Sequence, residues 1–150
     1  MNDIVARLEH LLSVVSEFAS SSSEVALLKK PSPEKWSKKE LIGHLIDSGI
    51  NNLQRFTEIQ FSTQPFKIRR YNQDELVRVN DYQNADISEI VTFLLAINRR
   101  IINVVMRQTD RSLTRRIAID TDHHSDLRFL IQDYVDHFQH HVNQIIDPTR

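Results

Sequence analysis

Apolar residues recur at spacings of three and four along four long segments of this chain, and this period constrains the fold more than any other feature. The spacing matches the turn of an α-helix, so each segment is predicted to bury one apolar stripe against its neighbours. The chain also has only two glycines and four prolines, too few turn formers for a many-stranded fold. We therefore expect an all-α four-helix bundle that occupies residues 1–150 as a single domain. The predicted helices cover about residues 2–19, 37–61, 86–105 and 125–147.

Two of the expected helix starts carry a local signal. Ser37 is followed three residues later by Glu40, and Asp86 is followed in the same way by Glu89. In this spacing, called a capping box, each side chain satisfies a backbone N–H that the first helical turn leaves unpaired. Short extra helices are expected in the connections at about residues 24–28 and 73–79, with a loop and at most a short extended piece over 109–124.

Charge and cysteine content exclude several classes of function. The formal net charge is -1 and the isoelectric point is about 6.7, so no overall positive field attracts nucleic acid. The basic residues occur as dispersed pairs, which usually form solvated helix faces. The chain has no cysteine, so disulfides and thiolate metal sites are excluded, and any metal must be held by nitrogen and oxygen ligands.

The sequence contains no candidate membrane segment. No apolar run approaches the roughly 20 residues that cross a bilayer as a helix. The N-terminal stretch alternates charged with apolar residues and lacks the basic start and apolar block of a signal peptide. We expect this stretch to be a helix of the mature protein, and we expect a cytoplasmic location.

Two of the seven histidines share one face of a predicted helix. His137 and His141 are spaced i, i+4, so both side chains leave the last helix on the same side, one turn apart. Imidazole nitrogens on adjacent turns reach one metal ion at the roughly 2.0–2.1 Å that zinc–nitrogen bonds need. Such a pair also arises by chance in a histidine-rich chain, so the spacing alone does not establish a metal site.

A third histidine, His44, lies in an apolar run of the second predicted helix. A hydrogen-bonded core histidine is the ordinary interpretation of such a position. The adjacent Gly43 weakens a helix by about 1 kcal/mol relative to alanine, which indicates that another group approaches the backbone closely there. One histidine on one helix and an i, i+4 pair on a facing helix fit the ligand pattern of bundle metal sites. These residues are compatible with both interpretations, a metal site and a metal-free core.

Two short motifs resemble those of the DinB-like superfamily, also called DinB/YfiT-like. The stretch WSKKELIGHLIDS at residues 36–48 resembles its second-helix signature, and HFQHHVNQI at residues 137–145 resembles its last-helix signature. The order and separation of the motifs also agree, so the resemblance spans nearly the whole chain. It implies a four-helix bundle with a three-histidine site for nickel, zinc or a similar ion. The implied ligands are His44, His137 and His141.

The resemblance also implies chemistry at the metal. Three histidine ligands leave at least one position for water or substrate, which separates catalytic from structural sites in zinc proteins. Members of the family include transferases of low-molecular-weight thiols, a thiol-dependent isomerase and proteins assigned as metal-dependent hydrolases. Our first interpretation is a metal-dependent transferase that activates a small thiol, which comes from solution because the chain has no cysteine. The alternatives are a metal-dependent hydrolase that uses metal-bound water, and a non-catalytic bundle that binds a metal or another ligand.

Four further residues are candidates for hydrogen-bonding neighbours of the implied ligands. Asp47 and Asn51 follow the ligand of the second helix by three and seven residues, so they lie on parts of its face. Asp133 precedes the first histidine of the last-helix pair by four residues, and its carboxylate is suited to accept the other imidazole N–H. Gln144 follows the second histidine of the pair by three residues and fits the family motif. The two acids have an ordinary alternative as surface residues.

The expected partner is a small-molecule substrate, with no nucleic acid and no membrane. Members of the family are often homodimers. The first predicted helix also has apolar residues over a wide arc, including Val5 and Val14, which is more than one core requires. A homodimer is therefore the expected assembly.

Overall fold

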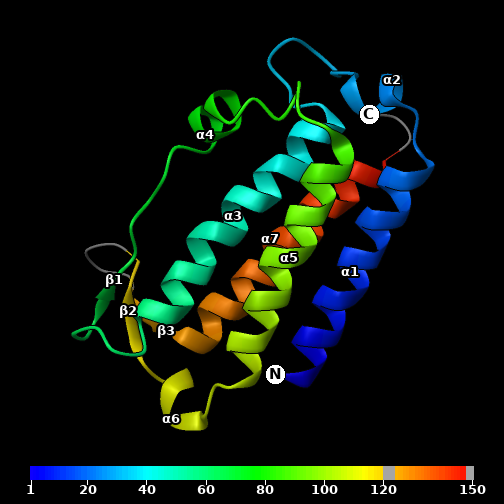
Figure 1. Cartoon of the computed structure of the whole chain (residues 1–150). Helices are drawn as coiled ribbons and strands as arrows, with labels where there is room; N and C mark the ends of the chain where they lie inside the picture. The colour runs from blue at the N-terminus through cyan, green and yellow to red at the C-terminus, as the bar shows by residue number, and fades with distance from the viewer. Residues whose placement is uncertain (120–123, 148–150) are drawn as a thin grey trace.

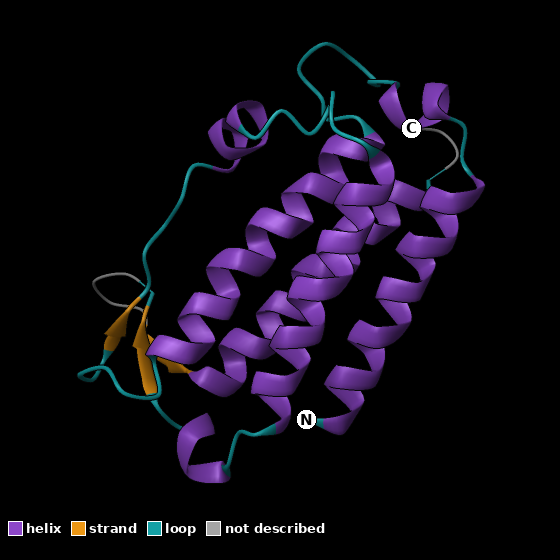
Figure 2. Cartoon of the chain, in the orientation of Figure 1, coloured by secondary structure: helices purple, strands orange, loops and turns teal. Residues whose placement is uncertain are grey.

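Four long helices lie side by side and form the body of the computed structural model (Figure 1). The structure describes residues 1–119 and 124–147. Within these residues the other elements are short helices and strands (Figure 2), so the expected all-α four-helix bundle is confirmed. The long helices are α1 (Asn2–Ser21), α3 (Lys38–Glu58), α5 (Ile87–Met106) and α7 (Leu127–Ile146). The short elements are the helices α2 (Glu24–Leu28), α4 (Gln73–Val79) and α6 (Asp110–Leu113) and the strands β1 (Phe66–Lys67), β2 (Arg116–Ala118) and β3 (His124–Asp126).

The long helices do not alternate in direction along the chain. In Figure 1, α1 and α7 run one way while α3 and α5 run the other, so the chain travels back along the bundle between α3 and α5. This crossover, residues 59–86, carries β1 and α4. Helix α3 packs against both α5 and α7, and α1 packs against α7 and α5. The antiparallel pairing of α3 with α7 places the start of α3 beside the end of α7.

Side-chain caps fix where the long helices begin. The Ser37 hydroxyl accepts a hydrogen bond from the Glu40 backbone N–H, and the Glu40 carboxylate accepts one from the Ser37 N–H. The predicted capping box at the start of α3 is therefore complete. Asp86 and Asp126 cap α5 and α7 by accepting hydrogen bonds from backbone N–H groups of the first turn. Each such cap contributes about 1 kcal/mol to helix stability.

A small sheet lies beside the end of α3 and the start of α7 (Figure 1). Strand β2 pairs in parallel with β1 and antiparallel with β3. The sequence predicts a loop with at most a short extended piece over 109–124, whereas the structure has the helical turn α6 followed by β2 in this region. Arg115 donates from Nε to the Ile59 carbonyl at 2.6 Å and from Nη2 to the Ser62 carbonyl at 2.8 Å. Its guanidinium thereby pairs backbone carbonyls just beyond the end of α3, which a helix terminus leaves unsatisfied.

The apolar stripes of the long helices meet in one core. On α3, Ile42, Leu45 and Ile46 are fully buried. On α1, Val5 is buried in the core of the same chain and Val14 packs partly buried against it, so the wide apolar arc of α1 is used at least in part within the bundle. Among the described helices, none has the length and apolarity that a membrane span requires.

One polar contact ties the start of α3 to the end of α7. Lys38 is 7% exposed, and its Nζ donates to the backbone carbonyl of Asp147 at 2.7 Å. The next residue, Lys39, forms an ion pair with Glu24 of α2 at 2.6 Å. These contacts fix the register of α3 at the end of the bundle that holds the histidines.

Gly43 gives space to an aromatic ring. A Cβ at this position would lie 2.2 Å from two ring atoms of Tyr82, Cγ and Cδ2, and 2.8 Å from the Tyr82 Cβ. Tyr82 is buried and belongs to the crossover. The close approach that the glycine predicts is therefore made by the Tyr82 side chain, which packs on the backbone of α3.

Replacing Gly43 with alanine is expected to lower the free energy of unfolding by about 1–3 kcal/mol, the usual cost of overpacking. This loss should appear although alanine favours a helix by about 1 kcal/mol over glycine. Gly49→Ala in the same helix is the matched control. Its Cβ would lie 3.3 Å from the nearest atom, Ile97 Cγ2, whereas a Cβ at Gly43 would lie 2.2 Å from the Tyr82 ring. Urea denaturation followed by circular dichroism measures both variants. Equal stability of the two variants would contradict the packing of Tyr82 on Gly43.

Candidate metal centre

Three histidines from two helices converge where α3 begins and α7 ends. His44 lies in the second turn of α3, and His137 and His141 lie on successive turns of α7. His44 is 0% exposed and His141 is 9% exposed, while His137 is partly buried. One ring nitrogen from each residue lies within 4.8 Å of the others. The structure thus brings together the three histidines that the sequence singles out.

The separations of His137 Nε2 from the other two rings fit a shared transition-metal ion. The Nε2 atom of His137 lies 3.2 Å from Nε2 of His44 and 3.1 Å from Nε2 of His141. Two nitrogen ligands at about 2.0–2.1 Å from one ion, with an angle between about 90° and 109°, lie about 2.8–3.4 Å apart. Three imidazoles suit zinc, nickel, copper and iron alike, so the ligand set does not select one metal.

Gln144 sets the tautomer of one histidine in the cluster. Its Oε1 lies 3.1 Å from His141 Nδ1, and its Nε2 lies 3.0 Å from Nε2 of the exposed His140. Because a carbonyl oxygen only accepts hydrogen bonds, His141 donates from Nδ1 and keeps the lone pair of Nε2 for the cluster. Outer hydrogen bonds of this kind orient histidine ligands in metal sites.

The buried His44 ring packs against an aromatic side chain. The ring centroid of Trp36, which precedes α3, lies 4.8 Å from that of His44. The Nδ1 atom of His44 is buried and has no hydrogen-bond partner among the described residues. A buried polar atom without a partner costs free energy of folding. A metal–nitrogen bond at Nε2 would not give Nδ1 a partner, but its own free energy would offset this cost in the folded chain.

Burial favours the neutral form of His44 and of His137. The pKa of His44 is lowered to about 3, mainly by burial and further by the nearby His141 and His137 rings. Burial also lowers the pKa of His137, although the Asp133 carboxylate acts against this by raising it. A neutral imidazole is the form that binds a metal, because ligation uses the ring lone pair.

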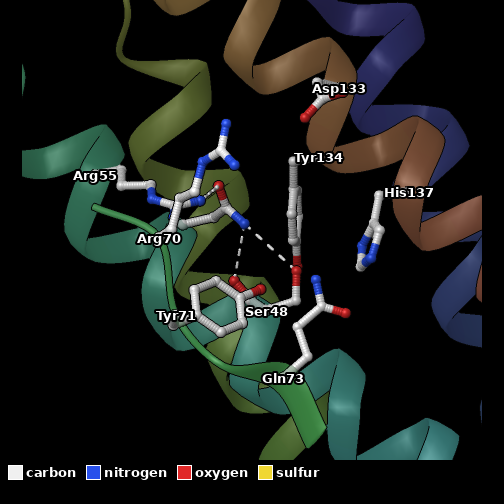
Figure 3. A pocket seen from close by; sticks show the side chains of 9 residues that line it. Ser48, Arg55, Arg70, Tyr71, Gln73, Asp133, Tyr134 and His137 are labelled. Carbon is white, nitrogen blue, oxygen red and sulfur yellow. Dashed lines mark hydrogen bonds between the residues drawn. The ribbon is translucent and has the colours of Figure 1, made fainter. Parts of the chain in front are cut away.

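A pocket of about 260 Å³ lies next to the cluster and is lined in part by His137 (Figure 3). Its volume is just below the range of about 300–1,000 Å³ typical of small-molecule sites. The pocket therefore suits a small ligand in contact with one of the three histidines. Its walls are formed by Ser48, Asn52 and Arg55 of α3, by Arg70, Tyr71 and Gln73 of the crossover, and by Asp133, Tyr134 and His137 of α7.

The two predicted neighbours on α3 form hydrogen bonds away from the histidine rings. The buried carboxylate of Asp47 accepts hydrogen bonds from the Tyr82 hydroxyl at 2.7 Å and from the Asn80 amide at 2.8 Å. Burial raises the pKa of Asp47, and these two hydrogen bonds oppose the rise. Asn51 donates to the backbone carbonyl of Asp47 at 2.9 Å. Asp133 is exposed and lines the pocket on α7.

Sequence reasoning missed the wall of the pocket opposite α7. Arg55 of α3 and the crossover residues Arg70 and Tyr71 line it, and the crossover has no helical period that would place the last two beside α3. The one signal was the basic composition around Lys67, Arg69 and Arg70, which by itself indicates a solvated surface.

The family model of the DinB superfamily matches residues 7–145 of the sequence. The chain belongs to the DinB superfamily. The two motifs that resemble the family signatures lie within the matched residues and carry the three clustered histidines. No curated protein sequence matches the chain.

Several solved structures share the fold of this DinB-superfamily protein. YfiT from Bacillus subtilis, described as a probable metal-dependent hydrolase with an unusual four-helix bundle topology, is 22% identical with a TM-score of 0.85, over 96% of this chain and 82% of YfiT. The DinB-like protein YjoA from Bacillus subtilis is 19% identical with a TM-score of 0.65, over 95% of this chain and 86% of YjoA. The mycothiol-dependent maleylpyruvate isomerase is 9% identical with a TM-score of 0.75, over 98% of this chain and 61% of the isomerase.

The stability of the metal-free DinB-superfamily protein is expected to fall as the pH drops below about 6.5. Between that value and the native pKa of about 3, the unfolded chain binds a proton at His44 that the folded chain does not bind. The free energy of unfolding therefore decreases by up to about 1.4 kcal/mol per pH unit from this residue.

His44→Gln removes this titration and serves as the reference. Urea denaturation of both proteins in the presence of a chelator, at several pH values between about 5.5 and 7.5, measures the stability difference across the onset of His44 protonation in the unfolded chain. That difference should shrink as the pH falls. A difference independent of pH would mean that His44 is not held as a neutral buried imidazole.

Proposed function

We propose that this protein is a metal-dependent enzyme in which His44, His137 and His141 hold one nickel or zinc ion. The observation that carries the proposal is that the Nε2 atoms of His44 and His141 both lie close to Nε2 of His137. His137 also lines the pocket, so it belongs both to the histidine cluster and to the pocket wall. Three protein ligands leave at least one coordination position for another molecule. When bound, such an ion lowers the pKa of a coordinated thiol or water and polarises a carbonyl group.

The first reaction we propose is the transfer of a small thiol to an electrophilic substrate. The chain has no cysteine, so the thiol comes from solution and enters the pocket as a small molecule. The fold shared with the mycothiol-dependent maleylpyruvate isomerase supports a thiol-dependent reaction. In this reaction we propose that the Asp133 carboxylate, which is exposed and lines the pocket, accepts the proton that the thiol releases and passes it to solvent.

Hydrolysis is the second candidate. The fold shared with YfiT, which is described as a probable metal-dependent hydrolase, supports it. The same pocket would hold an ester or amide, and Asp133 would accept a proton from the attacking water. The two reactions differ in the nucleophile, so the product separates them: thiol transfer gives an adduct that contains the thiol, and hydrolysis gives an acid that does not.

A homodimer, implied by the resemblance to the family, and a cytoplasmic location, expected from the sequence, stay proposals. A non-catalytic metal-binding bundle is the outcome that remains if the ion binds but neither nucleophile does. The small-molecule substrate is supported by the size of the pocket beside His137.

The protein is expected to contain about one equivalent of a divalent transition metal. His137→Ala should lose the metal, because the two histidine ligands that remain bind the ion too weakly to retain it. His10→Ala, which removes an exposed imidazole from α1, is the control and should keep the metal. Elemental mass spectrometry of tag-free protein, before and after reconstitution with nickel or zinc, measures the content. Equal metal content in both variants would contradict the proposed ligands.

Adding 2-mercaptoethanol to the cobalt-substituted protein is expected to produce a thiolate-to-cobalt absorption band, because a coordinated thiol is deprotonated. His10→Ala should show the same band, and His44→Ala should show none. A cobalt spectrum that does not respond to thiol, together with ester hydrolysis by the zinc form, would favour the hydrolase over the transferase.

A further inference from the structure

Two arginines stand on the side of the pocket that faces away from α7. In Figure 3 the side chains of Arg55 and Arg70 lie on one side of the pocket, and Tyr134 and His137 lie on the other. Arg55 projects from α3 and is partly buried, whereas Arg70 projects from the crossover and is exposed. The pocket thus has a cationic side and a histidine side, and a ligand that fills it meets both.

The cationic side is held in place by contacts within the chain. The Nη2 atom of Arg55 donates to the backbone carbonyl of Arg69 at 2.5 Å, and its guanidinium lies over the Tyr71 ring at 5.5 Å from the centroid. The backbone N–H of Ile68 donates to the Ala118 carbonyl at 3.0 Å, which extends the pairing of β1 with β2. The segment that carries Arg70 is therefore tied both to α3 and to the sheet.

Neither arginine is neutralised by a carboxylate. Within the described part of the chain, no ion pair joins Arg55 or Arg70 to an acidic side chain. Arg55 makes two hydrogen bonds, to the Arg69 carbonyl and, at 3.4 Å, to Asn52 Oδ1, out of the five N–H groups that a guanidinium carries. Burial lowers the pKa of Arg55, while Tyr71 and Asp133 raise it, so this cation loses solvent without gaining a paired anion.

The charges that line the pocket leave one positive charge unbalanced. Arg55 and Arg70 are cationic, and Asp133 is the one acid among the lining residues, so the lining side chains sum to one positive charge, to which an ion at the histidines would add. A ligand with a single negative charge balances this set, and the planar fork of a guanidinium matches a carboxylate. The small volume of the pocket suits a short organic acid.

We propose that Arg70 and Arg55 bind a carboxylate group of the molecule that reacts at the three-histidine centre, so that the thiol or its acceptor is a small organic acid. This inference rests on the proposed function, because it takes the histidine side of the pocket as the reacting end. Arg70 supplies the exposed guanidinium that meets the incoming acid. Arg55 supplies the second cation and positions Tyr71 and the backbone of Arg69.

The test compares ω-mercaptocarboxylates of increasing chain length with their uncharged amides on cobalt-substituted protein. Titration of the thiolate-to-cobalt band gives the affinity for each probe. We expect the best carboxylate to bind about tenfold more tightly than its amide, which corresponds to one charge-assisted hydrogen bond. Arg70→Gln should reduce this preference to below about threefold, and added salt should weaken it in the wild type.

Arg69→Gln is the matched control, because it removes the same charge from the adjacent exposed position, whose side chain does not line the pocket. It should keep the preference for the carboxylate. Comparing the ratio of affinities between proteins cancels the different thiol pKa values of the two probes. A preference that is equal in the wild type and in Arg70→Gln would overturn the proposal, and it would show that the carboxylate binds elsewhere or at the ion.

A second arm separates this inference from the proposed function. The Nε–H resonances of Arg70 and Arg55 are followed by NMR in the metal-free protein while butyrate or butyramide is added. Butyrate should shift them and butyramide should not, whether or not the metal form binds thiols. An absent cobalt band with a butyrate-specific shift rejects the thiol reaction and keeps the carboxylate site. A cobalt band with 2-mercaptoethanol but no carboxylate preference and no butyrate shift rejects the carboxylate site alone.

Discussion

The antiparallel packing of α3 against α7 is the constraint on which the site depends. His44 and His137 are 93 residues apart in sequence, yet their Nε2 atoms lie 3.2 Å apart because the start of one helix is held beside the end of the other. Core side chains of both helices and the bond from Lys38 to the Asp147 carbonyl fix this register. A slip by one helical turn would move the rings by about 5.4 Å, which is more than any metal–nitrogen bond tolerates. The same packing of α3 against α7 therefore both stabilises the bundle and sets the distances between the histidine rings.

The helices and the histidine pair could be predicted because both are local. A helical period and a capping box involve residues a few positions apart, and the box at Ser37 and Glu40 forms as its spacing indicates. The i, i+4 spacing of His137 and His141 likewise places both rings on one face without any tertiary information. Assigning His44 to the same cluster required the resemblance to a family, because nothing local to α3 tells a ligand from a core histidine. Gly43 pointed to a close approach, and the group that makes it, Tyr82, comes from the crossover.

The parts that could not be predicted depend on contacts between distant segments. Helix spacing places Asp47 on a face of α3, but only the fold shows that its carboxylate turns towards Tyr82 and Asn80. The cationic side of the pocket exists because Arg55 bonds the backbone of the crossover, a segment without periodic pattern. Gln144 is the opposite case, since its bond to His141 spans three residues of one helix and follows from spacing alone.

The costs of this fold are concentrated near the candidate site. Three buried side-chain polar atoms lack a hydrogen-bond partner among the described residues, and two of them, His44 Nδ1 and Asp47 Oδ2, belong to one turn of α3. Elsewhere in the core the chain satisfies such groups, as where the buried Tyr134 hydroxyl donates to Asn98 at 2.6 Å. Natural proteins leave buried polar groups without hydrogen-bond partners mainly at functional sites. Because an ion that binds only the folded chain stabilises it, metal binding would offset part of this cost and couple the loading of the site to the stability of the α3–α7 end of the bundle.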